Sequence, residues 1–200
     1  MNKDSSNLNL LFSTPVWISL IPNYEEVNNK MYNYIKNLQT KDPEGVKKSN
    51  IHGWHSNNFD LDIEEPKFFI NAISSSLNEA FNDMSWDVKS HKVKVTSMWS
   101  VVNVKNSHNS RHIHSNNYIS AAYYVKAPKK AGDIVFHDPR SAAVYHKPKV
   151  KEANILNSTI FKVEPKEGLL ALFPSYLHHS VETNQSNEER IVISFNINLF

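Results

Sequence analysis

The hydrophobic pattern of this 200-residue chain changes its period near Asp87, and this change constrains the fold more than any other feature. Before Asp87, apolar residues recur at the spacing of amphipathic helices, whereas after it they alternate as in strands. Turn residues divide the second part into predicted strands at 92–104, 117–126, 132–137, 143–146, 157–164, 169–173, 178–183 and 189–199. This many short strands with few helices indicates a double-sheet jelly roll, the cupin-like barrel.

The residues before Asp87 predict one strand and two helices. Residues 11–12 and 16–20 resemble a strand interrupted at Pro15, and Asn23 is the predicted cap of the helix that follows. Residues 40–62 read as loop, and a second helix is expected after Pro66. The predicted fold class is therefore α+β, with a double-stranded β-helix core and two N-terminal helices packed on one sheet. We expect a single domain over 1–200, in which residues 1–86 cover the barrel and 87–200 form it.

Composition limits the classes of function. With 22 basic and 20 acidic residues, the net charge of +2 gives no electrostatic reason to expect a nucleic acid or an anionic membrane as partner. The chain has no cysteine, which excludes disulfides, thiolate zinc sites and cysteine nucleophiles. The apolar residues 8–12 are too few for a signal sequence or a membrane span. We therefore expect a cytoplasmic protein.

Three histidines form a candidate metal site. On a strand, residues i and i+2 share a face, so His112 and His114 present both imidazoles to one side. His179 follows the apolar strand 169–173 and supplies a third ligand from elsewhere in the barrel. Three histidines converging in a small barrel suit Fe(II), Zn or Cu. The chain has ten histidines, however, and we interpret four others as surface or hydrogen-bonded residues: His52, His55, His91 and His146.

Arg190 is a candidate anion-binding residue. It begins a predicted strand on which Arg190, Val192 and Ser194 share the inward face. A buried arginine is costly unless an anion meets it, and its planar fork matches a carboxylate, to which Ser194 can add a hydroxyl donor. The alternative is a surface charge on an edge strand beside Glu188 and Glu189.

Together these residues resemble the 2-oxoglutarate/Fe(II)-dependent oxygenase superfamily. Its pattern is His-x-Asp/Glu, a distal His, and then an Arg on the last core strand, and this chain offers His112-Ile-His114, His179 and Arg190 in that order. Residues 163–174 are similar to the corresponding stretch of prolyl-hydroxylase-like members. Residues 119–128 and 132–140 resemble still more closely a subgroup of these oxygenases found in marine bacteria and phages.

The resemblance implies an iron enzyme that couples oxidative decarboxylation of 2-oxoglutarate to substrate oxidation, most simply hydroxylation, with O2 as cosubstrate. Arg190 would pair with the distal carboxylate of 2-oxoglutarate, Ser194 would support it, and Tyr124 would bond the same carboxylate. Asn103 is a weaker candidate contact of the cofactor. Core packing is the alternative for Tyr124, and a satisfied polar residue at a strand end is the alternative for Asn103.

The sequence departs from the family at the second ligand, which is usually a carboxylate and here is His114. Three neutral imidazoles leave the iron site one unit more positive, and an imidazole fills the position that a halide would need in a halogenase. A carboxylate from elsewhere could replace it, and Asp138 is the nearest candidate, although Asp138-Pro139 reads more simply as a turn that pairs with Arg140. His108 could also serve as a ligand but is expected in a loop, whereas His178 should point away.

Two other functions stay open at this point: a three-histidine cupin-type metalloenzyme that does not use 2-oxoglutarate, and a non-catalytic jelly-roll binding module. The primary substrate is not identified by the sequence. Candidate substrate contacts are Trp54, Trp99, Arg111 and Arg140. A homodimer is a further expectation, because jelly rolls with exposed edges and an N-terminal strand often pair.

Overall fold

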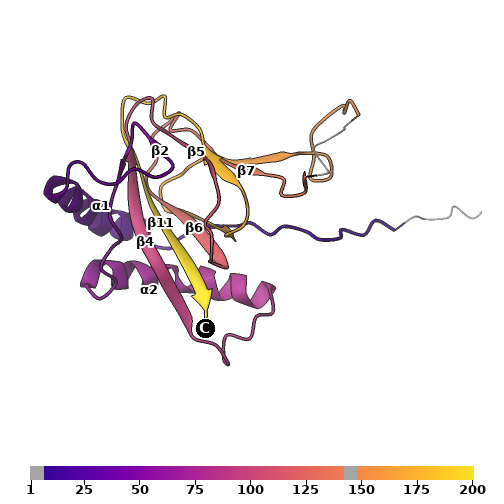
Figure 1. The fold of residues 1–200 in the computed structure, drawn as a ribbon, viewed down its shortest axis with the longest axis horizontal. Helices are drawn as coiled ribbons and strands as arrows, with labels where there is room; N and C mark the ends of the chain where they lie inside the picture. The colour runs from indigo at the N-terminus through magenta and orange to yellow at the C-terminus, as the bar shows by residue number, and fades with distance from the viewer. Residues whose placement is uncertain (1–6, 142–147) are drawn as a thin grey trace, which may run out of the picture.

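The computed structural model describes residues 7–141 and 148–200, and these residues form two helices and eleven strands (Figure 1). In chain order the elements are β1 (Trp17–Leu20), α1 (Tyr24–Lys41), β2 (Asn50–Ile51), β3 (Trp54–His55), α2 (Glu64–Asp83), β4 (Val93–Asn103), β5 (His108–His112), β6 (Ile119–Lys126), β7 (Ile134–His137), β8 (Ile160–Val163), β9 (Leu169–Pro174), β10 (His179–Val181) and β11 (Arg190–Leu199).

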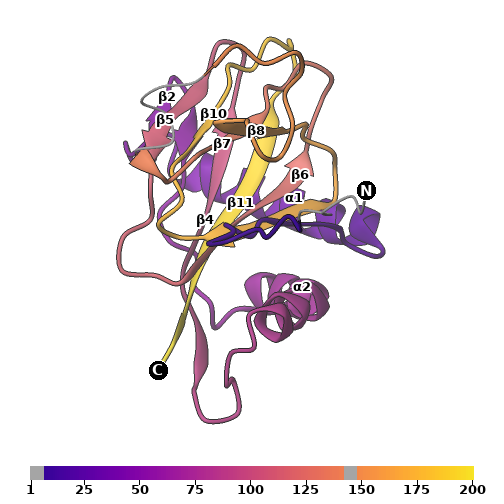
Figure 2. The same ribbon diagram turned by 90° about the vertical axis from the view of Figure 1, so that its right-hand side faces the viewer.

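The strands form two antiparallel sheets. The large sheet has the order β1-β9-β6-β11-β4-β3, and the small sheet has the order β2-β5-β10-β7-β8. Strands that follow one another along the chain often lie in different sheets, as β4 and β5 or β10 and β11 do. This exchange between sheets is typical of a jelly roll. The long strands β4 and β11 run the full height of the large sheet (Figure 2).

The two helices cover the outer face of the large sheet. Ile35 of α1 and Phe69 of α2 share one buried cluster with outward residues of the sheet such as Ile193 and Phe195. Tyr123 of β6 also points outward, and its hydroxyl donates to Asn28 Oδ1 of α1 over 2.6 Å. The inner face of the large sheet meets the small sheet in a second, smaller apolar cluster. The expected arrangement of two N-terminal helices on one sheet is confirmed.

Most of the predicted strands are present with slightly different ends, and the candidate at 143–146 lies outside the described residues. Three short strands were not predicted. β5, with the sequence HNSRH, has no alternation of apolar residues, and its side chains face the histidine cavity or solvent. β2 and β3 have two residues each within the stretch expected to be loop. Residues 11–12 form no strand; Leu11 and Phe12 are exposed.

Both helix starts differ from expectation in their details. Asn23 stands at the N-cap position of α1, but its backbone is left-handed (φ 52°) and its side chain makes no capping bond. Its carbonyl oxygen accepts from Glu26 N and Val27 N instead. α2 begins at Glu64 rather than after Pro66, because proline is tolerated in the first turn, where the N–H groups have no helical partner. Neither helix of the described residues carries an apolar stretch long enough to cross a membrane.

Candidate metal centre

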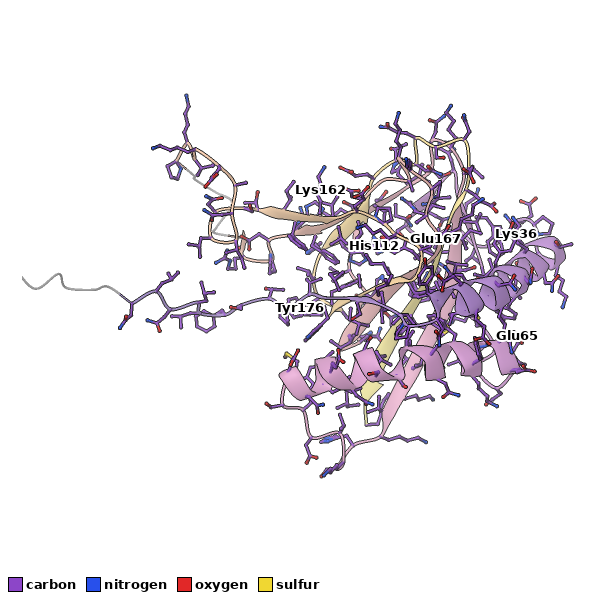
Figure 3. All side chains as sticks on the ribbon, turned by 180° about the vertical axis from the view of Figure 1, so that it is seen from behind. Lys36, Glu65, His112, Lys162, Glu167 and Tyr176 are labelled. Carbon is purple, nitrogen blue, oxygen red and sulfur yellow. The ribbon has the colours of Figure 1, made fainter. Side chains whose placement is uncertain are left out.

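The imidazoles of His112, His114 and His179 converge between the two sheets. His112 ends β5 and lies opposite His179, the first residue of the neighbouring strand β10. The possible ligand atoms of the three residues lie within 4.8 Å of one another. Figure 3 shows His112 amid the strands, away from the helical layer. The structure therefore brings together the three histidines that the sequence singled out.

Each of the three rings has an acceptor at Nδ1. Nδ1 of His112 lies 2.7 Å from Ser110 O, Nδ1 of His179 lies 3.0 Å from Leu177 O, and Nδ1 of His114 lies 2.7 Å from Asn196 Oδ1. An acceptor at Nδ1 favours the tautomer that carries its proton there, which leaves the Nε2 lone pair for a metal. The Nε2 atoms of His112 and His114 are already 3.3 Å apart.

Burial keeps these imidazoles neutral. It lowers the pKa of His179 to about 3 and that of His114 to about 4, and it also lowers the pKa of His112. The neighbouring imidazoles lower the pKa of His179 further. Neutral imidazole is the form that binds metal, so the three rings are ready for a cation at ordinary pH.

His114 is not on the strand from which its orientation was predicted. β5 ends at His112, and His114 lies two residues beyond it, outside any strand and just before the turn at residues 115–116. Its position is set by its backbone N, which donates to Ser175 O over 3.0 Å, and by the bond from its ring to Asn196. Asn196 is itself held by Ser120, whose hydroxyl donates to Oδ1, and by Ser97, which accepts from Nδ2. The sequence analysis did not find this supporting network.

A cavity of about 630 Å³ extends from the three histidines to Arg190, which lines it and is 1% exposed. The interpretation of Arg190 as a surface charge is therefore wrong. Its Nη1 donates to Gly132 O over 3.0 Å and also to Ala131 O, whereas its Nε and Nη2 have no hydrogen-bond partner among the residues that the structure describes. A buried guanidinium with two free donors is costly, and a carboxylate is the group that satisfies both together. This arrangement fits a dicarboxylate such as 2-oxoglutarate.

The other predicted cofactor contacts also line the cavity. Tyr124 is 1% exposed, and burial raises the pKa of its phenol to about 12, so it is a neutral donor beside the guanidinium of Arg190. Ser194 lies on the same face of β11 as Arg190. Asn103 lies opposite Arg190 in the ladder, and its Nδ2 donates to Asn109 Oδ1 over 3.0 Å, which ties β4 to β5.

The remaining candidates are placed elsewhere. Asp138 is not part of the histidine cluster, and its Oδ2 accepts from Arg140 Nη2 over 2.9 Å, as the turn interpretation expects. His178 is also outside the cluster. His108 begins β5 instead of lying in a loop, and it borders a different surface hollow.

His55 was interpreted only as a hydrogen-bonded residue, and its Nδ1 does lie 2.7 Å from Ser56 O. It also lines the cavity and stacks on Trp99, with ring centroids 5.7 Å apart and an angle of 10°. The ring centroids of Trp99 and His114 are in turn 5.4 Å apart. A short loop before β2 adds Lys48 and Ser49 to the rim. Nothing in the local sequence of this loop signals its approach to the histidines.

Comparisons with known proteins agree with this geometry. The model of a family described as "Putative 2OG-Fe(II) oxygenase" matches residues 97–196, which is half of the chain. A search of curated proteins finds no match.

Solved structures show the same fold. A prolyl-4-hydroxylase from Pseudomonas putida is similar at a TM-score of 0.66 and 12% identity, covering 94% of both chains. A viral collagen prolyl hydroxylase from Paramecium Bursaria Chlorella virus-1, solved with 2OG, has a TM-score of 0.61 at 14% identity, covering 91% of this chain and 94% of that one. A Trichoplax adhaerens prolyl hydroxylase has a TM-score of 0.64 at 13% identity, with 94% and 84% coverage. The strand core is thus a double-stranded β-helix, as predicted.

Proposed function

Because the chain belongs to the 2OG-Fe(II) oxygenase family, we propose that His112, His114 and His179 bind its iron and that Arg190 binds its 2-oxoglutarate. The protein is an Fe(II)- and 2-oxoglutarate-dependent dioxygenase, and its cosubstrates are 2-oxoglutarate and O2. The proposal adds which residues hold these groups and what each contributes. We further propose that the reaction is a hydroxylation.

One observation supports the residue roles above all others. Nε and Nη2 of Arg190 are buried without a partner in the described part of the chain, and Arg190 lines the same cavity as the three histidines. A metal site alone does not require a buried guanidinium with free donors. A ligand that bridges the metal and the arginine accounts for both features, and 2-oxoglutarate carries a chelating end and a distal carboxylate.

Bound iron supplies the oxidising chemistry by activating O2 against 2-oxoglutarate. The residues of the chain bind and orient the iron and 2-oxoglutarate, and they keep water out of the cavity. Tyr124 and Ser194 offer hydroxyl donors to the carboxylate held by Arg190. Phe173 and Val192 give the cavity apolar walls, which strengthen the pairing of Arg190 with an anion because they keep water away. Asn103 joins the two sheets beside Arg190 and thereby fixes that end of the cavity.

His114 takes the place of the usual carboxylate ligand. Its Nδ1 is held by Asn196, so its Nε2 is presented to the site with the neutral charge of an imidazole. An imidazole at this position fills the place that a halide would take, which favours hydroxylation over halogenation. Asp138 is engaged by Arg140 and is not needed as a ligand.

Anaerobic titration with Fe(II) and then 2-oxoglutarate tests the roles of these residues. We expect a visible metal-to-ligand charge-transfer band in the wild-type protein, and its loss in His179→Ala. His178→Ala is the matched control, because it removes a neighbouring imidazole that is outside the cluster. The band should also fail to form in Arg190→Ala at 2-oxoglutarate concentrations that saturate the wild type. Metal uptake without a band would favour a three-histidine enzyme that does not use 2-oxoglutarate, and no uptake would favour a binding module.

We also propose that the protein works in the cytoplasm. A chain without cysteine cannot form the disulfides that oxidising compartments favour, so its composition fits a reducing compartment. A homodimer is proposed as well. Residues 7–12 extend away from the strands (Figure 1) and expose Leu8, Leu10, Leu11 and Phe12, and β1 is an edge strand. Light scattering should give twice the monomer mass for the wild type and the monomer mass for Leu11→Ser/Phe12→Ser. A monomeric wild type would contradict the dimer.

A further inference from the structure

Two basic side chains, Lys48 and Arg111, lie exposed at the rim of the cavity that holds the three histidines. None of the described residues that line this cavity is Asp or Glu, although the whole chain is nearly balanced in charge. Within the described part of the chain, neither Lys48 nor Arg111 takes part in an ion pair. The entrance to the site is therefore cationic and lacks an acidic partner of its own.

The strand pairing brings together the two segments that carry these cations. β2 pairs antiparallel with β5, and just before β2 the amide of Ser110 donates to the carbonyl of Ser49 over 2.9 Å. Lys48 and Arg111 are the next residues along the two segments, and both line the cavity. Like charges at one cavity repel each other, and a bound anion offsets that repulsion.

The residues that carry the two cations are neighbours, along the chain, of residues at the metal site. The hydroxyl of Ser49, the neighbour of Lys48, is 3.4 Å from Nε2 of His112, which is the neighbour of Arg111. Trp99 connects the rim of the cavity with the histidine cluster. Its ring stacks on His55 at one side, and its ring centroid is 5.4 Å from that of His114 at the other.

Lys48 is near His55 as well. Burial lowers the pKa of His55, and the charge of Lys48 lowers it further. A small molecule bound by Lys48 and Arg111 would therefore pack against Trp99, and its other end would lie near the histidines.

The charge balance of the loaded site leads to the same conclusion. The two negative charges of 2-oxoglutarate balance the two positive charges of Fe(II), because His114 contributes no charge where the family usually has a carboxylate. With Arg190 paired to one carboxylate of 2-oxoglutarate, the loaded site keeps an excess of positive charge, and Lys48 and Arg111 have no acidic residue beside them among the described residues of the cavity. On the basis of the function proposed above, we propose that the primary substrate is a compound with a carboxylate or phosphoryl group, which Lys48 and Arg111 bind while Trp99 packs against the adjoining part.

Binding of small aromatic probes to the protein saturated with Fe(II) and 2-oxoglutarate, without O2, tests this substrate class. Isothermal titration compares benzoate with benzamide and phenyl phosphate with phenol, so that the members of each pair differ mainly in charge. We expect at least one anion to bind about tenfold more tightly than its neutral partner, with the advantage falling as salt is raised. The pair with the larger ratio identifies the group as carboxylate or phosphoryl.

Two double variants locate the binding site. Lys48→Gln/Arg111→Gln should reduce the affinity for the anion to that of the neutral probe. Lys47→Gln/Arg140→Gln removes one lysine and one arginine outside the cavity and should leave the preference unchanged. The reversal Lys48→Glu/Arg111→Glu should favour benzylamine over benzoate. Because all four substituted positions are exposed, we expect the three double variants to fold, and circular dichroism checks this.

The charge-transfer band, recorded in the same samples, separates this proposal from the proposed function. A wild type without the band would overturn the function of the site. A normal band with equal binding, or no binding, of charged and neutral probes would overturn only the anionic substrate. An anion preference that survives in Lys48→Gln/Arg111→Gln, or that is lost equally in Lys47→Gln/Arg140→Gln, would also overturn it.

Discussion

The two faces of β11 have opposite characters. Its outward side chains, which include Ile193 and Phe195, are fully buried under the helices in the apolar core. Its inward side chains include one apolar residue, Val192, and three polar ones, Arg190, Ser194 and Asn196, which border the cavity or hold the ring of His114. These two sets alternate along one strand and occupy the same ten residues.

This difference shows how a two-residue period separates stability from chemistry. The outward face contributes by removing apolar surface from water, which requires only size and shape. The inward face places a guanidinium and a hydroxyl at the cavity and an amide against the ring of His114, and it leaves Nε and Nη2 of Arg190 without a partner among the described residues. Substitutions on the outward face should therefore lower the free energy of unfolding, whereas those on the inward face should lower the affinity for Fe(II) or 2-oxoglutarate.

The largest effect is expected on the outward face, in Phe195→Ala. Phe195 is fully buried and meets the ring of Phe69 edge to face at 6.0 Å. Truncation should lower the free energy of unfolding by about 3–5 kcal/mol. Urea unfolding measures this, with Phe195→Leu as the control that keeps most of the volume. The affinity of the folded variant for 2-oxoglutarate should stay unchanged, and a large loss of affinity would contradict the separation of the two faces.

Arg190→Met, on the inward face, should give the next largest effect, on the affinity for 2-oxoglutarate and not on the free energy of unfolding. It removes the proposed partner of the 2-oxoglutarate carboxylate, and we expect the affinity for 2-oxoglutarate to fall about 30–1000-fold. The ligand-free protein should lose little stability, because the cost of burying Nε and Nη2, which have no partner among the described residues, offsets the loss of the Nη1 bonds to Ala131 O and Gly132 O. Thermal unfolding with and without 2-oxoglutarate separates the two outcomes. A ligand-free variant that is much less stable, with its thermal shift intact, would make Arg190 a structural residue.

The sequence predicted the parts of this design that depend on period and spacing. The alternation on β11 gave the inward direction of Arg190 and Ser194, and the residues around His112 and His179 gave two candidate ligands on neighbouring strands. The polar strand β5 could not be found by hydrophobic alternation, because its side chains face a cavity and solvent.

The supports of the site depend on contacts between residues far apart in the chain. Asn196 reaches His114 across 82 positions, and Ser49 reaches His112 across 63. Periodicity carries no information on such pairs, since they follow from how the two sheets pack.

Asn196→Ala tests the inward face at a residue that would touch neither iron nor 2-oxoglutarate. Asn196 Oδ1 fixes the ring of His114, so its loss should weaken Fe(II) binding about 10–100-fold. Anaerobic equilibrium dialysis measures this affinity. Asn198→Ala is the control, since Asn198 lies on the same strand and bonds to the backbone of Asn116 instead. If both variants lose the same affinity, Asn196 does not act through His114.

The smallest effect should come from Ser194→Ala. Ser194 lines the cavity on the face of Arg190, and one neutral hydroxyl donor to a carboxylate contributes about 0.5–1.5 kcal/mol. We therefore expect the KM for 2-oxoglutarate to rise about 2–10-fold with kcat nearly unchanged, because the lost bond is to the bound cosubstrate in its ground state.

Two further variants decide whether this effect belongs to the inward face. Ser194→Thr keeps the hydroxyl and should restore most of the affinity. Ser100→Ala, on the neighbouring strand β4, removes a buried hydroxyl outside the cavity that has no partner in the described structure, so it should leave the KM unchanged. A KM that rises equally in Ser100→Ala and Ser194→Ala would mean that loss of a buried hydroxyl, not its position on the inward face, causes the effect.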